Sequence, residues 1–234
     1  MDIKNIHKVT CGILTEPECL NNARALLYQS YIQDLAWEIT HDNPSNIKIH
    51  HVDEHTTLTD DFDELSVWFS ISNKEAVIAC ARLCHEDENG LLEIERYENA
   101  RRCIKPILDQ KEKLNIIELN REAILPRYSE QRELYGLILL REIFEYCLAQ
   151  NYTILTTSNI PDWISIYELI SFKGMDEYSF KYFDSEPSSV SVYLATPGDI
   201  KRLLENINCC LNAHRNIGPT SSAPLQEIKG QLYV

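Results

Sequence analysis

The sequence predicts a single α/β (α+β) domain, in which a central, mixed and mostly antiparallel sheet is flanked by helices. Three observations support this prediction. Apolar runs of strand length alternate with segments of helical periodicity. The 234 residues are enough for one substantial core, and no linker-like stretch or internal repeat divides them. We expect the domain to span residues 1–214 and residues 215–234 to form a loosely ordered tail.

The first half of the chain begins with a helix over residues 16–39, where apolar and aromatic residues recur at helical spacing. The polar stretch that follows, up to residue 64, is expected to be largely loop. Two strands come next, over residues 65–72 and 75–83. Both segments are apolar, and only a turn-like Asn-Lys joins them.

The second half centres on the apolar run 115–125, which predicts the central strand and which Pro126 helps to end. The helix over 129–151 begins at a serine, carries leucine and isoleucine at helical spacing and ends at an asparagine. The remaining expected elements are strands over 152–158, 179–183 and 189–196 and helices over 161–172 and 197–214.

Composition narrows the class of protein. The formal charge of −14 argues against nucleic acid as the main partner, because phosphate binding needs a basic surface. No apolar run reaches the roughly 18 residues of a membrane-spanning helix, and the N-terminal residues lack the pattern of a secretory signal. The eight cysteines are scattered without a C-x-x-C pair and are expected to be reduced thiols. We therefore expect a cytoplasmic protein.

Two charged residues, Glu118 and Arg121, interrupt the central apolar run "IIELNREAIL" (116–125). A buried strand does not readily hold an unpaired carboxylate, but charge-assisted hydrogen bonds to guanidinium groups would satisfy it. We therefore expect a charged network at one end of the sheet. Its expected members are Asp60, Asp63, Arg82, Glu118 and Arg121. The alternative is a buried salt bridge that only fixes the strand.

The element order and four short motifs resemble one branch of the Gcn5-related N-acetyltransferase fold, the acyl-homoserine-lactone synthases and long-chain N-acyl amino acid synthases. The central strand of that branch carries Glu-Leu-Ser-Arg, which "ELNR" (118–121) matches apart from Asn120. "DDFD" (60–63) supplies its paired aspartates, and "ACARL" (79–83) supplies its Arg-Leu pair. "YIQDLAW" (31–37) supplies its aromatic residue, leucine and tryptophan.

The resemblance implies an N-acyltransferase that moves a medium- or long-chain acyl group to the amine of a small molecule. The acyl donor would be a thioester of coenzyme A or of an acyl carrier protein, and no metal would be needed. Glu118 would deprotonate the amine, directly or through one water. The implied substrate-binding residues are Trp37, Asp60, Asp63, Arg82 and Arg121.

The start of the long helix resembles the phosphate-binding loop of this fold, Gln/Arg-x-x-Gly-x-Gly/Ala. In "QRELYG", Gln131 and Gly136 fit the pattern, Leu134 replaces the first glycine, and Arg132 is placed to meet a phosphate. A backbone N–H near Ala123–Leu125 would polarise the thioester carbonyl. The alternative is an ordinary amphipathic helix start.

"YELISFKG" (167–174) resembles the Tyr-x-x-x-Gly-Phe ending of these enzymes, with Ser171 in place of the glycine. The resemblance implies that Tyr167 protonates the leaving thiolate. The alternative reading is a core aromatic residue on an amphipathic helix.

Three positions depart from the homoserine-lactone synthases. Leu27 stands where they carry an arginine, Leu58 where they carry an acid, and Glu122 where an aromatic residue is common. These positions belong to the part that handles S-adenosylmethionine. The resemblance therefore implies a plain amino acid or another small amine as acceptor instead of lactone synthesis.

A local cationic stretch could serve an acidic carrier protein despite the overall negative charge. Its residues are Arg101, Arg102 and Lys105, and the alternative is an ordinary solvated face. A metal site is a further alternative for "HHVDEH", with His50, His51, Asp53 and His55, although a solvated loop fits its polar context better.

Two alternative functions remain open on the same fold. One is an acetyl-CoA-dependent N-acetyltransferase. The other is a catalytically silent module that binds an acyl thioester or an amino acid.

Overall fold

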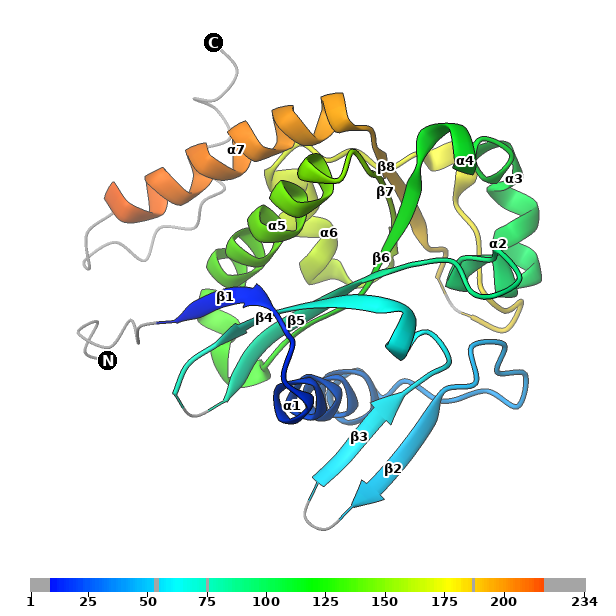
Figure 1. The fold of residues 1–234 in the computed structure, drawn as a ribbon, viewed down its shortest axis with the longest axis horizontal. Coiled ribbons are helices and arrows are strands. Elements are labelled where there is room, and N and C mark those ends of the chain that lie inside the picture. Colours follow the sequence, from blue (N-terminus) through cyan, green and yellow to red (C-terminus); the bar gives the residue numbers. More distant parts are fainter. Residues whose placement is uncertain (1–8, 53–54, 75, 187, 217–234) are drawn as a thin grey trace.

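The computed structural model describes residues 9–52, 55–74, 76–186 and 188–216. Its centre is a six-stranded sheet in the order β1-β4-β5-β6-β7-β8 (Figure 1). Only β6 and β7 pair in parallel, and the other neighbouring strands are antiparallel. The predicted mixed, mostly antiparallel sheet is confirmed. The strands are β1 (Thr10–Ile13), β4 (Ser66–Ser72), β5 (Val77–Cys84), β6 (Ile116–Ile124), β7 (Thr153–Ser158) and β8 (Ser191–Ala195).

Helices cover both faces of this sheet (Figure 1). Side chains alternate between the faces along each strand, so Phe69 packs with α5 to α7 and its neighbour Trp68 packs with α1. The short helices α2 and α3 form a third apolar cluster with Leu155 and Val192. The helices are α1 (Pro17–Leu27), α2 (Glu98–Cys103), α3 (Lys105–Leu108), α4 (Lys111–Leu114), α5 (Arg132–Ala149), α6 (Pro161–Leu169) and α7 (Pro197–Asn216).

Three segments differ from the sequence-based expectation. The polar stretch after the first helix contains a hairpin, β2 (Lys48–Val52) and β3 (His55–Thr59), because Leu58 and its apolar neighbours pack on α1. The first helix ends as an α-helix at Leu27 and continues as a π-helical segment, η2 (Tyr28–Asp34). The expected strand at 179–183 is reduced to a single bridge between Phe180 and Val190.

The last helix, α7, extends two residues past the expected boundary at residue 214. The remainder of the predicted tail, 217–234, lies outside the described residues. Within the ranges that the structure describes, no helix is long and apolar enough to cross a membrane.

β6 loses its parallel partner half-way along. The last pair with β7 joins Leu119 to Thr156, and only β5 continues beside β6 beyond that point. The register with β5 shifts at Arg121, which has a left-handed φ of 56° and forms a β-bulge. Neighbours on a regular strand point to opposite faces, but the bulge lets Asn120 and Arg121 both reach Glu93, at 2.7 and 2.6 Å.

Candidate active site

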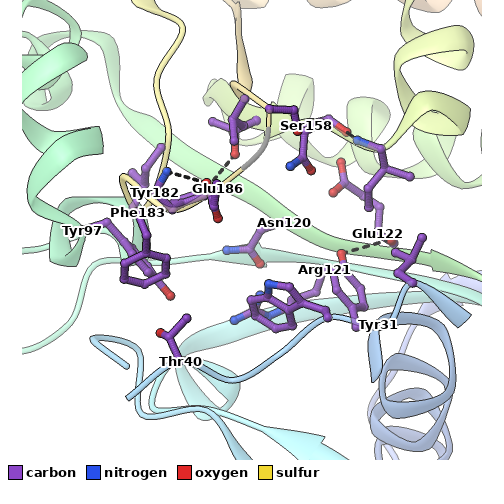
Figure 2. A pocket seen from close by; sticks show the side chains of 18 of the residues that line it. Tyr31, Thr40, Tyr97, Asn120, Arg121, Glu122, Ser158, Tyr182, Phe183 and Glu186 are labelled. Atoms are coloured by element: carbon purple, nitrogen blue, oxygen red, sulfur yellow. Dashed lines mark hydrogen bonds between the residues drawn. The ribbon is translucent and has the colours of Figure 1, made fainter. Parts of the chain in front are cut away.

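A cavity of about 530 Å³ lies over β6 and the end of β7. Its walls come from η2 and the loop after it, from η4 (Glu93–Arg96) and from residues 182–186 and 188–190 (Figure 2). The charged residues that line it are Glu38, Glu93, Glu118, Arg121, Glu122 and Glu186. The aromatic residues that line it are Tyr31, Trp37, Tyr97, Tyr182 and Phe183.

Behind the cavity wall, Arg82 on β5 is fully buried and uses all five of its N–H donors. Its two Nη atoms donate to the two oxygens of Asp60, each at 2.8 Å. Further bonds reach Asp63 at 2.5 Å and Glu93 at 2.7 Å. The Nε donates to Asn120 at 2.8 Å. The predicted charged network therefore exists, with Glu93 as an additional member.

Arg121 connects this network to the cavity. Its guanidinium donates to Asp60 at 2.8 Å and to Glu93 at 2.6 Å. It also lies 5.9 Å from the ring centroid of Trp37, within range of a cation–π contact. Arg121 is thus a cation in the cavity wall whose charge two carboxylates already share.

Glu118 reaches the cavity from the same strand and makes no ion pair with any described residue. Its Oε2 accepts the Ile94 N–H at 3.0 Å, and its Oε1 accepts the Asn120 amide at 3.2 Å. Asn120 therefore links it to the charged network. Burial, and then the charge of Glu93, raise the pKa of Glu118 to about 8. A carboxyl group with this pKa is suited to accept a proton from an amine near neutral pH.

Glu122 fills the place where β6 and β7 separate. Its carboxylate accepts hydrogen bonds from the hydroxyl groups of Tyr167 on α6 and Thr156 on β7, the latter at 3.4 Å. The indole N–H of Trp163 donates to its backbone carbonyl at 3.1 Å. Burial raises the pKa of Glu122 to about 7. Glu122 therefore connects β6 to β7 and α6 through its side chain, and it also lines the cavity.

Solved structures match this arrangement, whereas no protein-family model and no curated protein sequence matches the chain. FeeM, an N-acyl amino acid synthase from uncultured soil microbes, matches with a TM-score of 0.59 at 13% identity, over 87% of this chain and 98% of that chain. The acyl-homoserine-lactone synthase LasI matches with a TM-score of 0.51 at 15% identity, over 81% and 90%. BjaI, a CoA-dependent acyl-homoserine lactone synthase, matches with a TM-score of 0.51 at 12% identity, over 82% of each chain.

The chain has the Gcn5-related N-acetyltransferase fold, in the form seen in these synthases. The fold resemblance drawn from the sequence motifs is therefore confirmed.

Within this fold, the cavity exposes only part of the predicted site. The predicted residues that line it are Trp37, Glu118 and Arg121. Asp60, Asp63 and Arg82 lie behind the wall, so they hold Arg121 in place instead of offering free groups to a ligand. Tyr167 is buried behind Glu122, and a proton from its hydroxyl would pass through that carboxylate.

The residues predicted to hold the thioester donor are placed differently. The Leu125 N–H donates to the Ile78 carbonyl at 2.9 Å, so this N–H is not free to polarise a thioester. A backbone donor elsewhere in residues 123–125 stays a prediction. Gln131 is exposed, and Arg132, which begins α5, is paired with Asp162 at the start of α6. Their contact with a donor phosphate stays a prediction.

Gly136 has a packing role in this fold. A Cβ at Gly136 would lie 2.5 Å from Cδ1 of Ile166 on α6. We expect Gly136→Ala to lower the free energy of unfolding by about 1–3 kcal/mol, the usual cost of overpacking, in urea denaturation. Adding Ile166→Val removes that Cδ1 and should restore much of the loss. Unchanged stability of the single variant would contradict this close approach.

Four of the glutamates that line the cavity, Glu38, Glu93, Glu122 and Glu186, were not among the predicted site residues. Glu93 stands between Leu92 and Ile94, so it is a carboxylate inside an apolar stretch, as Glu118 is. That shared pattern is a signal that could have identified Glu93.

The described histidines of the segment 50–55 do not form a metal-binding cluster. His50 and His51 bond across the hairpin to Thr59 and Thr56, at 2.9 and 3.0 Å. Asp53, a further member of that candidate site, lies outside the described residues. Over the ranges that are described, no group of three or more His, Cys, Asp or Glu residues could hold a metal ion.

The cationic stretch lies on the exposed surface of α2 and α3. Arg101 is exposed, Arg102 donates to Asn99 at 3.2 Å, and Lys105 pairs with Asp109 at 2.5 Å. These contacts are within the surface itself, and carrier-protein docking on it stays a prediction.

The raised pKa of Glu122 makes stability depend on pH. Its pKa is about 7 in the folded chain against an ordinary 4.5. Between these values the folded state keeps a proton that the unfolded state releases, so the free energy of unfolding falls as pH rises. Glu122→Gln removes this titration.

We therefore expect Glu122→Gln to gain about 1–3 kcal/mol relative to the wild type between about pH 5 and about pH 8, measured by urea denaturation. Glu130→Gln, at an exposed acid, is the matched control. A constant difference between Glu122→Gln and the wild type across this range would contradict the assignment.

Proposed function

We propose that the protein is an N-acyltransferase, which moves an acyl group from a thioester to the amine of a small molecule. The observation that carries this proposal is the position of Glu118, a buried carboxyl group in the cavity wall that pairs with no cation in the part of the chain that is described. It lies next to the point where β6 and β7 separate. The fold shared with two kinds of acyl-transferring synthase supports the same activity.

The chemistry needs two proton transfers. The amine arrives as an ammonium ion, which has no lone pair, and Glu118 accepts its proton. The free amine attacks the thioester carbonyl, the C–N bond forms and the C–S bond breaks. The leaving thiolate then takes a proton, for which the candidate donor is Glu122, a buried acid on the cavity wall that is supported by the Tyr167 hydroxyl.

We further propose a medium- or long-chain donor, carried by coenzyme A or by an acyl carrier protein, in a cytoplasmic enzyme. Arg132 would bind a donor phosphate, and Arg101, Arg102 and Lys105 would bind an acidic carrier. BjaI, whose structure holds isopentyl-CoA, supports the coenzyme A form for this fold.

One observation favours a second candidate, an acetyl-CoA-dependent N-acetyltransferase. Glu122, Tyr167 and Trp163 fill the separation between β6 and β7 with hydrogen-bonded groups. A long acyl chain directed through the sheet would have to displace them, whereas an acetyl group would not.

The test is a donor panel on the purified protein. Acetyl, octanoyl and palmitoyl thioesters of coenzyme A and of acyl carrier protein are each mixed with a set of amines. Thiol release and N-acyl products are then measured, the latter by mass spectrometry. Amine-dependent release with the longer chains supports the first candidate, and release with acetyl-CoA alone supports the second. Thioester binding without any thiol release would overturn both and indicate a silent binding module.

A further inference from the structure

The cavity is strongly acidic. Among the described residues that line it, five are glutamates and one is an arginine. That arginine, Arg121, is already bonded to Asp60 and Glu93. Apart from Arg121, the acidic and basic side chains that a ligand meets among the described lining residues are therefore all carboxyl groups.

The buried network does not neutralise the other acids. Three guanidinium groups, on Arg24, Arg82 and Arg121, meet three buried carboxylates, on Asp60, Asp63 and Glu93. This set is balanced in itself.

The glutamates left over face the cavity without an ion pair in the described part of the chain. They are Glu38, Glu118, Glu122 and Glu186. A bound cation would lower the pKa of Glu118, which burial and Glu93 raise. The cation would therefore favour the deprotonated carboxylate, which is the form that accepts a proton.

An aromatic wall stands beside one of these acids. The rings of Tyr97 and Tyr182 have centroids 4.8 Å apart, and those of Tyr97 and Phe183 are 5.9 Å apart. Figure 2 shows these rings next to Glu186 at one end of the cavity, with Glu122 at the other end. Aromatic faces attract ammonium groups, most strongly where water is excluded. This end of the cavity thus combines two kinds of group that bind cations.

An amino acid, the acceptor expected from the sequence, would bring a carboxylate into this acidic space. Among the described lining residues, its one guanidinium partner would be Arg121, which has two carboxylates already. An unpaired charge in a buried site is costly.

We propose that the acceptor is a diamine or polyamine, whose reacting nitrogen lies at Glu118 and whose second ammonium lies between Glu186, Glu38 and the aromatic wall. This inference rests on the proposed acyl transfer and specifies its acceptor.

Calorimetric titration of the full chain tests the charge requirement with three ligands that each contain four carbon atoms. These are 1,4-diaminobutane, 1-butylamine, which lacks the second charge, and 4-aminobutanoate, which carries a carboxylate in its place. We expect the diamine to bind about tenfold or more tightly than butylamine, and the zwitterion to bind most weakly. A zwitterion that binds as tightly as the diamine, or no diamine binding at all, would overturn the proposal.

Variants test the site itself. Glu186→Gln and Glu38→Gln should each reduce the preference for diamine over butylamine by several-fold, because butylamine has no second ammonium to lose. Circular dichroism reports whether each variant keeps the fold. Glu88→Gln, at an exposed acid that does not line the cavity, should keep the full preference. A preference that survives both cavity variants would overturn the assignment of the second ammonium.

Different results would contradict the acyl transfer and the diamine acceptor. Selective diamine binding without acylation by any thioester would remove the acyl transfer and leave the acceptor assignment. Acylation of amino acids in preference to diamines would remove the acceptor assignment and leave the acyl transfer.

Discussion

Replacing Glu118 by glutamine is expected to slow acyl transfer by about 10²–10⁴-fold, the usual contribution of a general base. The amide cannot accept the ammonium proton but has nearly the same shape. It can still accept one of the two hydrogen bonds that come from Ile94 and Asn120. Substrate binding and the fold should therefore persist while the chemical step is lost. The measurement is the initial rate of thiol release at saturating donor and amine.

The pH dependence separates a base from a structural residue. The pKa of Glu118 is raised to about 8, and only the deprotonated carboxylate can accept a proton. The turnover rate of the wild type should therefore rise with pH towards about pH 8. Glu118→Gln should lose this dependence, and the ratio of the two profiles cancels the ionisation of the amine itself.

Two variants complete this test. Glu118→Asp, which keeps a carboxylate but withdraws it, should recover part of the rate, and Glu88→Gln, at an exposed acid, should change nothing. Equal turnover in Glu118→Gln and the wild type would remove Glu118 from the mechanism.

Much of the fold follows from patterns that a single segment carries. β4 to β8 and α5 to α7 lie close to their predicted positions because each has an apolar run or a helical period of its own. The β2–β3 hairpin has no such pattern, because its sequence is rich in histidine and threonine. What stabilises it is the packing of Leu58 on α1, which is a tertiary contact. Residues 179–183 have a strand-like sequence but form only one bridge, from Phe180 to Val190, because no neighbouring strand of the described chain continues beside them.

For the site too, local sequence patterns reveal only some of the residues. The motif around Glu118 and Arg121 is visible in the sequence because charges within an apolar run are unusual. The position of Glu122 is not visible, because it depends on a left-handed φ at Arg121, a conformation that arginine rarely adopts. Glu93 enters the network from a segment of short helices whose periodicity is too brief to detect. Tertiary contacts therefore complete a site that local patterns only begin.

Arg82→Met is expected to lower the free energy of unfolding by about 3–5 kcal/mol, the cost of removing one partner of a buried ion network. Without the guanidinium, the carboxylates of Asp60, Asp63 and Glu93 would face one another in a buried space. Arg82→Lys keeps the charge but not the planar set of five donors, so its loss should be smaller. Urea denaturation gives each value.

The pH dependence of the Arg82→Met loss distinguishes lost charge pairing from lost packing. Although burial opposes it, Arg121 and Arg82 hold the pKa of Asp60 below its ordinary value. This pairing therefore stabilises the folded wild type at pH values above the ordinary pKa of an aspartate. As pH falls, the unpaired carboxylates of the variant take up protons, and its deficit should shrink. A cavity left by a shorter side chain would cost the same at every pH. A deficit that stays constant from about pH 8 to about pH 4 would therefore show that Arg82 acts through its packing volume, and the network would no longer explain how Arg121 and Glu93 are held at the cavity.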